Sequence, residues 1–191
     1  MRDLRSQRGF TLLEVIIVGM TAATLMAAAL MVLPGVIQAA KGSSGSSQLV
    51  ATLRLAREQS IAQRRNIEVR FVEPNRIECW RDDVDENGTL SGQTLVQTSI
   101  LEQGVSYERY DGVADTPDAF APGSNEVTFT GDAPWRFTTE GQVVDANGDV
   151  VNGTVFVGLP LRPDTARAIS LFGPTAIIRE WRWDGARWTS S

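Results

Sequence analysis

A single apolar segment near the start of the chain limits what this protein can be. Residues 10–33 form a run of 24 amino acids in which Glu14 is the only charged residue. A helix needs about 20 apolar residues to cross the hydrocarbon core of a bilayer, so this run is long enough. No second run of this length follows. The sequence therefore predicts one transmembrane helix.

The residues before the apolar segment predict its orientation. MRDLRSQRG, residues 1–9, carries three Arg and one Asp. Positive charges next to a membrane span stay on the cytoplasmic side, so we expect a cytoplasmic N-terminus and an external domain after Leu33.

The carboxylate of Glu14 argues against two simpler interpretations. A secretory signal peptide has a shorter apolar region and does not begin it with an acid. A plain membrane anchor has no use for a charge, because an ionised group in lipid costs roughly 2.5 kcal/mol or more and usually marks a function.

The stretch RGFTLLEV, residues 8–15, resembles the type III signal of type IV prepilins and pseudopilins. The resemblance implies that a prepilin peptidase cuts after Gly9 on the cytoplasmic side and that Phe10 becomes the N-methylated first residue. Glu14 is then the fifth residue of the mature chain and serves assembly. Its charge is tolerable in lipid if a released α-amino group, expected to belong to a neighbouring subunit, lies beside it.

A second resemblance lies in LRLAREQSIAQRRNIEVRF, residues 53–71, which is similar to the helix-to-strand passage of the GspH/FimT group of minor pseudopilins. Residues 137–157 are similar to the strand, turn and strand of that group. The resemblance implies a structural subunit of a type II secretion pseudopilus or a type IV pilus, held in the bacterial inner membrane with a periplasmic head. Its partners would be other pilin or pseudopilin subunits.

The pattern predicts an α+β fold, in which a long hydrophobic helix packs on an antiparallel β-sheet head. Leu49, Leu53, Ala56 and Ser60 recur at helical spacing and predict an amphipathic helix. KGSSGSS, residues 41–47, weakens helix formation and leaves two alternatives, a flexible linker or a continuous but pliable helix. The predicted parts are a leader at 1–9, a transmembrane helix at 10–33, a hinge or linker at 34–47, and a head at 48–191 with its helix at 48–66 and sheets at 67–191.

Strand patterns fill the chain after residue 66, with turn signals such as Asn-Gly and Asp-Gly between them. The predicted strands are 67–71, a return strand that begins at 77, 94–101, 105–110, 126–130, 135–139, 154–160, 167–172 and 177–183.

Composition excludes most enzymes and cofactors. The chain has no His and one Cys, so no His-based catalytic pair and no internal disulfide can form. Nothing pairs two carboxylates for acid–base chemistry. We therefore expect no catalytic residues and no cofactor.

One acidic segment leaves a calcium site open. Asp83, Asp85 and Asn87 follow the order of a calcium loop, but Thr94 stands where an EF-hand needs a bidentate Glu. The alternative, which we favour, is a polar turn of the kind that hairpins use.

The tail combines cations and aromatic rings, which are the materials of a nucleic-acid surface. Arg179 and Arg182 are the candidate DNA-binding residues. The alternative is that Trp181, Trp183 and Trp188 cover the core while the arginines pair with acids. DNA binding is not favoured, because the net charge is -5 and the family's C-terminal arginine motif is missing.

Overall fold

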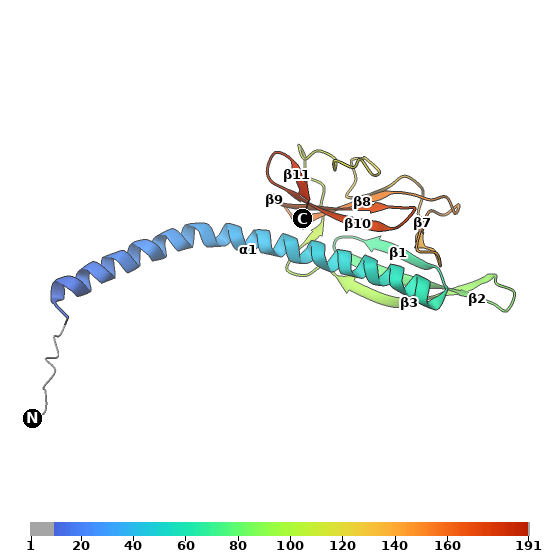
Figure 1. The fold of residues 1–191 in the computed structure, drawn as a ribbon, viewed down its shortest axis with the longest axis horizontal. Coiled ribbons are helices and arrows are strands. Elements are labelled where there is room, and N and C mark those ends of the chain that lie inside the picture. Colours follow the sequence, from blue (N-terminus) through green and yellow to red (C-terminus); the bar gives the residue numbers. More distant parts are fainter. Residues whose placement is uncertain (1–9, 191) are drawn as a thin grey trace, which may run out of the picture. The chain divides into compact units, whose positions relative to one another are not determined.

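The computed structural model of this protein describes residues 10–190 (Figure 1). The chain divides into two compact units, one that ends at Ile37 and one that begins at Gln38. We call the second unit the head. Gly9 and the rest of the expected leader lie outside the described residues.

One helix, α1, runs from Leu12 to Gln63 and contains 52 residues. The hydroxyl of Thr11 accepts a hydrogen bond from the backbone N–H of Glu14 at 3.2 Å, which caps the start of the helix. At the other end Arg64 adopts a left-handed backbone conformation with φ of 51°, and α1 ends there.

Residues 34–47, which we expected to form a hinge or linker, are helical throughout. Of the two alternatives for KGSSGSS, the structure contains the continuous helix. Its glycines serve close packing. A Cβ atom at Gly42 would lie 2.7 Å from the carbonyl oxygen of Thr165, and one at Gly45 would lie 2.6 Å from Cγ1 of Val105. Larger residues at these two positions would push α1 away from the rest of the head.

The head contains two antiparallel β-sheets (Figure 1). Sheet A has the strand order β3-β2-β1-β6-β7, and sheet B has the order β11-β10-β9-β8-β4, with β5 also paired to β8. The strands are β1 Ile67–Val72, β2 Arg76–Val84, β3 Leu90–Ile100, β4 Ser106–Tyr107, β5 Val127–Phe129, β6 Trp135–Phe137, β7 Val143–Val144, β8 Gly153–Leu159, β9 Arg162–Phe172, β10 Ile177–Trp183 and β11 Trp188–Ser190.

The main hydrophobic core joins the second half of α1 to both sheets. The predicted apolar stripe of the helix is confirmed, because Leu49, Leu53, Ala56 and Ser60 are all buried. The three apolar residues, Leu49, Leu53 and Ala56, pack in one cluster with inward residues of sheet A, such as Ile67 and Phe137, and of sheet B, such as Val155 and Ile169. This packing confirms the α+β architecture of the head.

A second, smaller cluster lies against sheet B and contains Val113, Phe156, Ala166, Ala168, Trp183 and Trp188. Strands β8 and β9 are therefore covered on both faces. All seven residues of β8 are buried, and so are residues 165–171 of β9. Strands buried on both faces lack the alternation of apolar and polar residues seen in half-exposed strands.

Strand β3 forms one edge of sheet A. Its 11 residues include no charged residue and no proline, and Leu90, Leu95 and Ile100 are exposed. By contrast, β1 and β2 carry charged side chains on the face of sheet A that points away from the helix.

Candidate functional site

The first unit presents an apolar helix surface with one unpartnered charge. Residues 10–37 are all exposed, and α1 is long and apolar enough to cross a membrane by length and composition. The hydroxyls of Thr21 and Thr24 donate to the carbonyl oxygens of Val18 and Thr21 at 2.9 Å, so these polar groups are satisfied within the helix. The Glu14 carboxylate makes no hydrogen bond or ion pair with any other residue among 10–190. Any partner for this charge must come from outside the described chain.

Glu14 also has a local role that the sequence analysis missed. It is the third residue of α1 and follows the capping Thr11, so Thr11 and Glu14 have the spacing of a capping box. A carboxylate in the first turn also interacts favourably with the helix dipole. The T-x-x-E pattern at residues 11–14 was the signal that could have found this role. Phe10 immediately precedes the cap and is 82% exposed.

A buried arginine fixes the start of the head to sheet B. Arg167 on β9 is 1% exposed, yet it forms no salt bridge with a described residue. Its guanidinium donates to the carbonyl oxygen of Ala39 at 3.3 Å and to the hydroxyl of Ser43 at 2.9 Å. It also donates to the carbonyl oxygens of Thr165 and Ala166. Burial lowers the pKa of Arg167, and this set of acceptors holds its charge in place.

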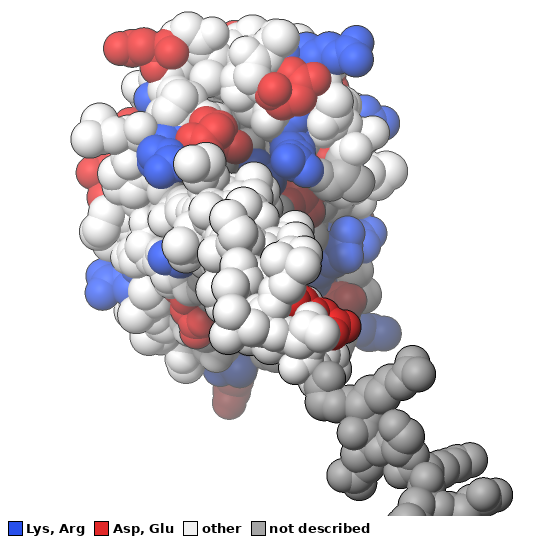
Figure 2. All heavy atoms as spheres, turned by 90° about the vertical axis from the view of Figure 1, so that its left-hand side faces the viewer, with Lys and Arg blue, Asp and Glu red and all other residues white. Residues whose placement is uncertain are grey.

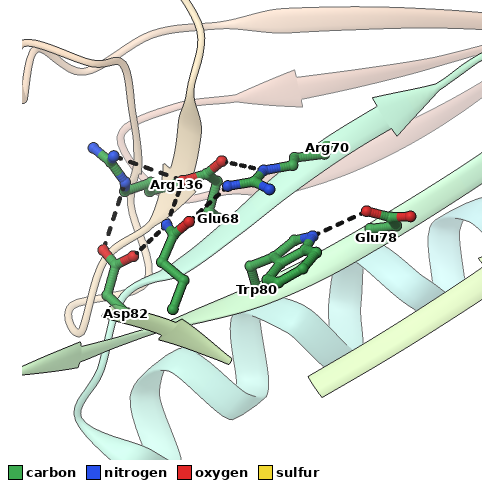
Figure 3. A network of polar contacts seen from close by, with 7 residues as sticks. Glu68, Arg70, Glu78, Trp80, Asp82 and Arg136 are labelled. Atoms are coloured by element: carbon green, nitrogen blue, oxygen red, sulfur yellow. Dashed lines mark hydrogen bonds and ion pairs between the residues drawn. The ribbon is translucent and has the colours of Figure 1, made fainter. Parts of the chain in front are cut away.

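Polar side chains form a network on the outer face of sheet A (Figure 3). We call it the outer-face network, and it contains Glu68, Arg70, Asp82, Gln93 and Arg136. The Gln93 amide donates to Glu68 at 2.6 Å and to Asp82 at 2.8 Å, while its oxygen accepts from Arg70 at 2.6 Å. The guanidinium of Arg136 forms two ion pairs, one from Nη2 to Oε2 of Glu68 at 3.6 Å and one from Nε to Oδ2 of Asp82 at 3.5 Å. Two carboxylates and two guanidinium groups thus balance one another and tie β1, β2, β3 and β6 together.

The outer-face network borders an open groove of about 940 Å³, which β1, the start of β3 and β6 line. The guanidinium of Arg70 also lies over the ring of Trp80, 4.7 Å from its centroid. Because the charges in the groove already pair within the protein, they serve the stability of sheet A.

Of the three candidate calcium ligands, Asp83 lies near the end of β2, and Asp85 and Asn87 lie in the segment that leads from β2 to β3. One carboxylate oxygen of Asp85 accepts hydrogen bonds from the backbone N–H groups of Asn87 and Thr89, both at 2.9 Å. The carboxylate of Asp83 instead binds Thr94 and Arg81, which together lower its pKa. Residues 85–89 thus form a polar turn between β2 and β3. No group of three or more His, Cys, Asp or Glu side chains in residues 10–190 is placed to hold a metal ion.

The tail residues divide between the core and the surface. Trp183 and Trp188 are 8% and 7% exposed and pack in the second cluster, as the structural alternative predicted. Arg179 and Arg182 are exposed and form no ion pair with any described residue, which that alternative did not predict. The two arginines are three residues apart in β10, so they point to opposite faces of sheet B. They do not form one continuous basic surface.

The surface charges of the head are mixed. On the face drawn in Figure 2, Lys and Arg side chains are interspersed with Asp and Glu side chains, and no large area has a single sign. The one thiol, Cys79, is fully buried, and burial raises its pKa to about 12. It stays protonated and inert, as is usual for a buried thiol in apolar surroundings.

Comparisons with known proteins identify the head. A model of the family described as type II transport protein GspH matches residues 46–173. Among solved structures, the type IV minor pilin FimU of Pseudomonas aeruginosa aligns with a TM-score of 0.45 and 13% sequence identity, over 77% of this chain and 91% of that chain. No curated protein matches the chain.

Proposed function

This chain belongs to the GspH family, and we propose that it is a membrane-anchored minor subunit of a type II secretion pseudopilus or a type IV pilus. The observation that carries the proposal is the helix α1. Its first unit is apolar, fully exposed and long enough to span a bilayer, while its second half is the core helix of the head. A helix of this kind serves both as a membrane anchor and as a packing element between subunits.

In this proposal the subunit passes through two states. A prepilin peptidase first removes residues 1–9, and the segment 10–33 holds the subunit in the bacterial inner membrane with the head in the periplasm. The segment then packs against equivalent helices of other pilin or pseudopilin subunits in the fibre. Glu14 guides this transfer by attraction to the terminal amine of a neighbour, because opposite charges attract more strongly as the dielectric constant falls. The proposed role is structural, and no catalytic step is assigned.

The Thr11 cap makes a sharp test of Glu14 possible. The Thr11 hydroxyl accepts from the backbone N–H of residue 14, which Gln retains, so Glu14→Gln keeps this cap and removes only the charge. We expect this variant to be processed normally and to be depleted from sheared fibres. The matched control is Thr11→Ala, which removes the cap and keeps the charge, and which we expect to assemble. Immunoblots of the fibre fraction measure both.

Mass spectrometry of the membrane-bound protein tests processing. We expect a first residue of Phe10 with a methylated amine. A native chain that still begins at Met1 contradicts the proposal, and so does a Glu14→Gln subunit that enters fibres as well as the wild type. The gene neighbourhood then separates the two systems, since a secretin and secretion ATPase accompany one and pilus retraction genes the other.

DNA binding in natural transformation is the second candidate function. The observation in its favour is that Arg179 and Arg182 are exposed and have no ion-pair partner in the described chain. A DNA-binding head must lose affinity steeply with added salt, and replacing both arginines by Ala must reduce the salt dependence. If the wild-type head does not bind a short DNA duplex at low salt, this candidate function is wrong.

A further inference from the structure

The turn between β8 and β9 carries the most exposed large hydrophobic side chain of the described chain. Pro160 and Leu161 form this turn, and Leu161 is 90% exposed. Its backbone lies in the left-handed region with φ of 61°. Residues 160–164 are exposed without exception.

Leu161 is unfavourable here for two independent reasons. A side chain with a Cβ is strained in the left-handed region, where Gly or Asn is the usual choice. Gly88, Gly148 and Gly185 occupy such positions in other turns of the head, and of the six non-Gly residues with positive φ among residues 10–190, Leu161 is the one large apolar side chain. An exposed leucine also gains nothing from burial within the protein. An outlier that the rest of the fold does not need is a reason to look for a function.

The turn is held in one conformation. The hydroxyl of Thr165 accepts a hydrogen bond from the backbone N–H of Leu159 at 2.9 Å and donates one to the carbonyl oxygen of Arg162 at 2.7 Å. The guanidinium of Arg162 makes two further hydrogen bonds to the carboxylate of Asp164, at 3.0 and 3.1 Å. The Thr165 bonds hold the two strands together at the base of the turn and leave Leu161 at its tip. The charges of Arg162 and Asp164 are paired with each other.

The turn lies beside the residues with which the head begins. Thr165 touches α1 at Gly42, and Arg167 binds Ala39 and Ser43. Leu161 is four residues from Thr165, which limits their separation to about 13 Å. In the sequence, the apolar segment ends at Leu33, five residues before the head begins at Gln38, and the first charged residue after Glu14 is Lys41. The tip is therefore near the part of the head that follows the apolar segment in the chain.

We propose that the Pro160–Leu161 tip enters the interfacial layer of the membrane while the subunit is anchored there. The inference rests on the membrane anchoring that is part of the proposed function. One leucine suffices because the head is already tethered, so its contact with lipid does not have to supply the free energy of association. The contact fixes the rotation of the head about the anchor and decides which face of the head meets an incoming subunit.

A fluorescent label at the tip tests this contact in the full-length chain. Leu161→Cys is labelled with an environment-sensitive fluorophore and reconstituted into phosphatidylethanolamine and phosphatidylglycerol vesicles at a high ratio of lipid to protein. Cys79 does not react, because it is buried with a raised pKa. The matched control is Asn87→Cys, an exposed site in the turn between β2 and β3. This turn follows β2, and Asp82 of β2 donates a hydrogen bond to Asn66, just after the C-terminal end of α1. We expect a blue shift and quenching by lipids brominated near the headgroup at Leu161 only.

A second measurement avoids the label, which is itself apolar. Amide hydrogen exchange of residues 159–165 is compared in vesicles and in detergent for the wild type and for Leu161→Asp. We expect the vesicle to slow exchange in the wild type and to leave the Asp variant unchanged. Flotation of the vesicles first establishes that the chain is anchored, so a chain that does not float contradicts the anchoring and not the tip contact. In floated vesicles, an unshifted label with unprotected amides overturns the tip contact. A shift that appears only at high protein density overturns it too, in favour of contact with a neighbouring subunit.

Discussion

Gly42 shows how a single residue decides the position of a helix. The missing Cβ leaves room for the carbonyl oxygen of Thr165, which is part of the backbone of β9 and cannot rotate away. Glycine weakens an isolated helix by about 1 kcal/mol relative to alanine, so its presence here reflects the packing and not the helix.

We therefore expect Gly42→Ala to lower the stability of the head, although alanine favours helix formation. Overpacking against backbone typically costs about 1 to 3 kcal/mol, which outweighs the gain in helix propensity. Gly35→Ala is the matched control, because no atom lies within 4 Å of its Cβ position. Thermal unfolding of both variants in detergent measures the difference. A Gly42→Ala head as stable as the wild type contradicts the packing argument.

Glu108 predicts a pH dependence of stability. Burial and the nearby charge of Glu126 raise its pKa, so folding favours the protonated form. Its contribution to stability is present below the ordinary glutamate pKa of about 4.3 and is lost as the pH rises through the raised value. We expect Glu108→Gln to raise the midpoint of thermal unfolding at pH 7 and to leave it nearly unchanged at pH 3. Equal effects at both pH values count against this assignment.

At the scale of elements, four strands of sheet A depend on the outer-face network. Glu68 is 4% exposed and accepts hydrogen bonds from Arg70 and Gln93, with Arg136 also close. Removing one partner of a buried charge pair leaves the other charge uncompensated, which typically costs about 3 kcal/mol.

Glu68→Ala should therefore destabilise the head by about 3 kcal/mol, as measured by denaturant unfolding. Asp164→Ala serves as the control, since its ion pair with Arg162 leaves the two side chains 54% and 46% exposed. Exposed pairs contribute at most about 1 kcal/mol. If both substitutions have the same small effect, the network does not hold sheet A together.

Strand length alone did not decide what could be predicted from sequence. The predicted strands include the short β5 and β6, whereas the predicted starts of the long β3 and β9 lie four and five residues too late. Alternating residues located β1, and the apolar runs located β8 and β10 within one residue at each end. Strands β7 and β11 were missed because two or three residues carry no periodicity, and pairing with neighbours alone defines them. The strand predicted at 105–110 is confined to Ser106–Tyr107 in the structure, because only these two residues pair with β8.

The side-chain sites show the same limit. The spacing of Thr11 and Glu14 is local, so the Thr11 cap can be found from sequence alone. The acceptors of Arg167 and the members of the outer-face network come from distant segments, and nothing in the sequence marks which polar residue meets which. The sequence left two alternatives open for KGSSGSS for the same reason, because the atoms that require its glycines belong to Val105 and Thr165.

For the whole molecule, the unit that begins at Gln38 predicts where the head can be cut. The expected head began at residue 48, but Ser43 binds Arg167 and Ser46 binds Glu180 on sheet B. A fragment of residues 48–191 loses both contacts and the close packing of Gly42 and Gly45.

We expect a fragment of residues 38–191 to unfold cooperatively and the fragment 48–191 to be less stable by about 2 kcal/mol or more, because hydrogen bonds to a charged group are lost. Denaturant unfolding of the two fragments gives the difference. An Arg167→Met substitution in both supplies the control, since it should reduce the gap between them. Equal stability of the two unmodified fragments shows that residues 38–47 add nothing to the head.

The uncharged edge of sheet A has a consequence for any purified form of this protein. Natural sheets protect an outermost strand with lysine, proline or irregularity, because free backbone groups there are a template for further strands. Over the 11 residues of β3 only two register irregularities with β2 interrupt the ladder. At high concentration, heads released from the membrane are therefore expected to aggregate by pairing of their β3 strands. Leu95→Lys should keep them soluble.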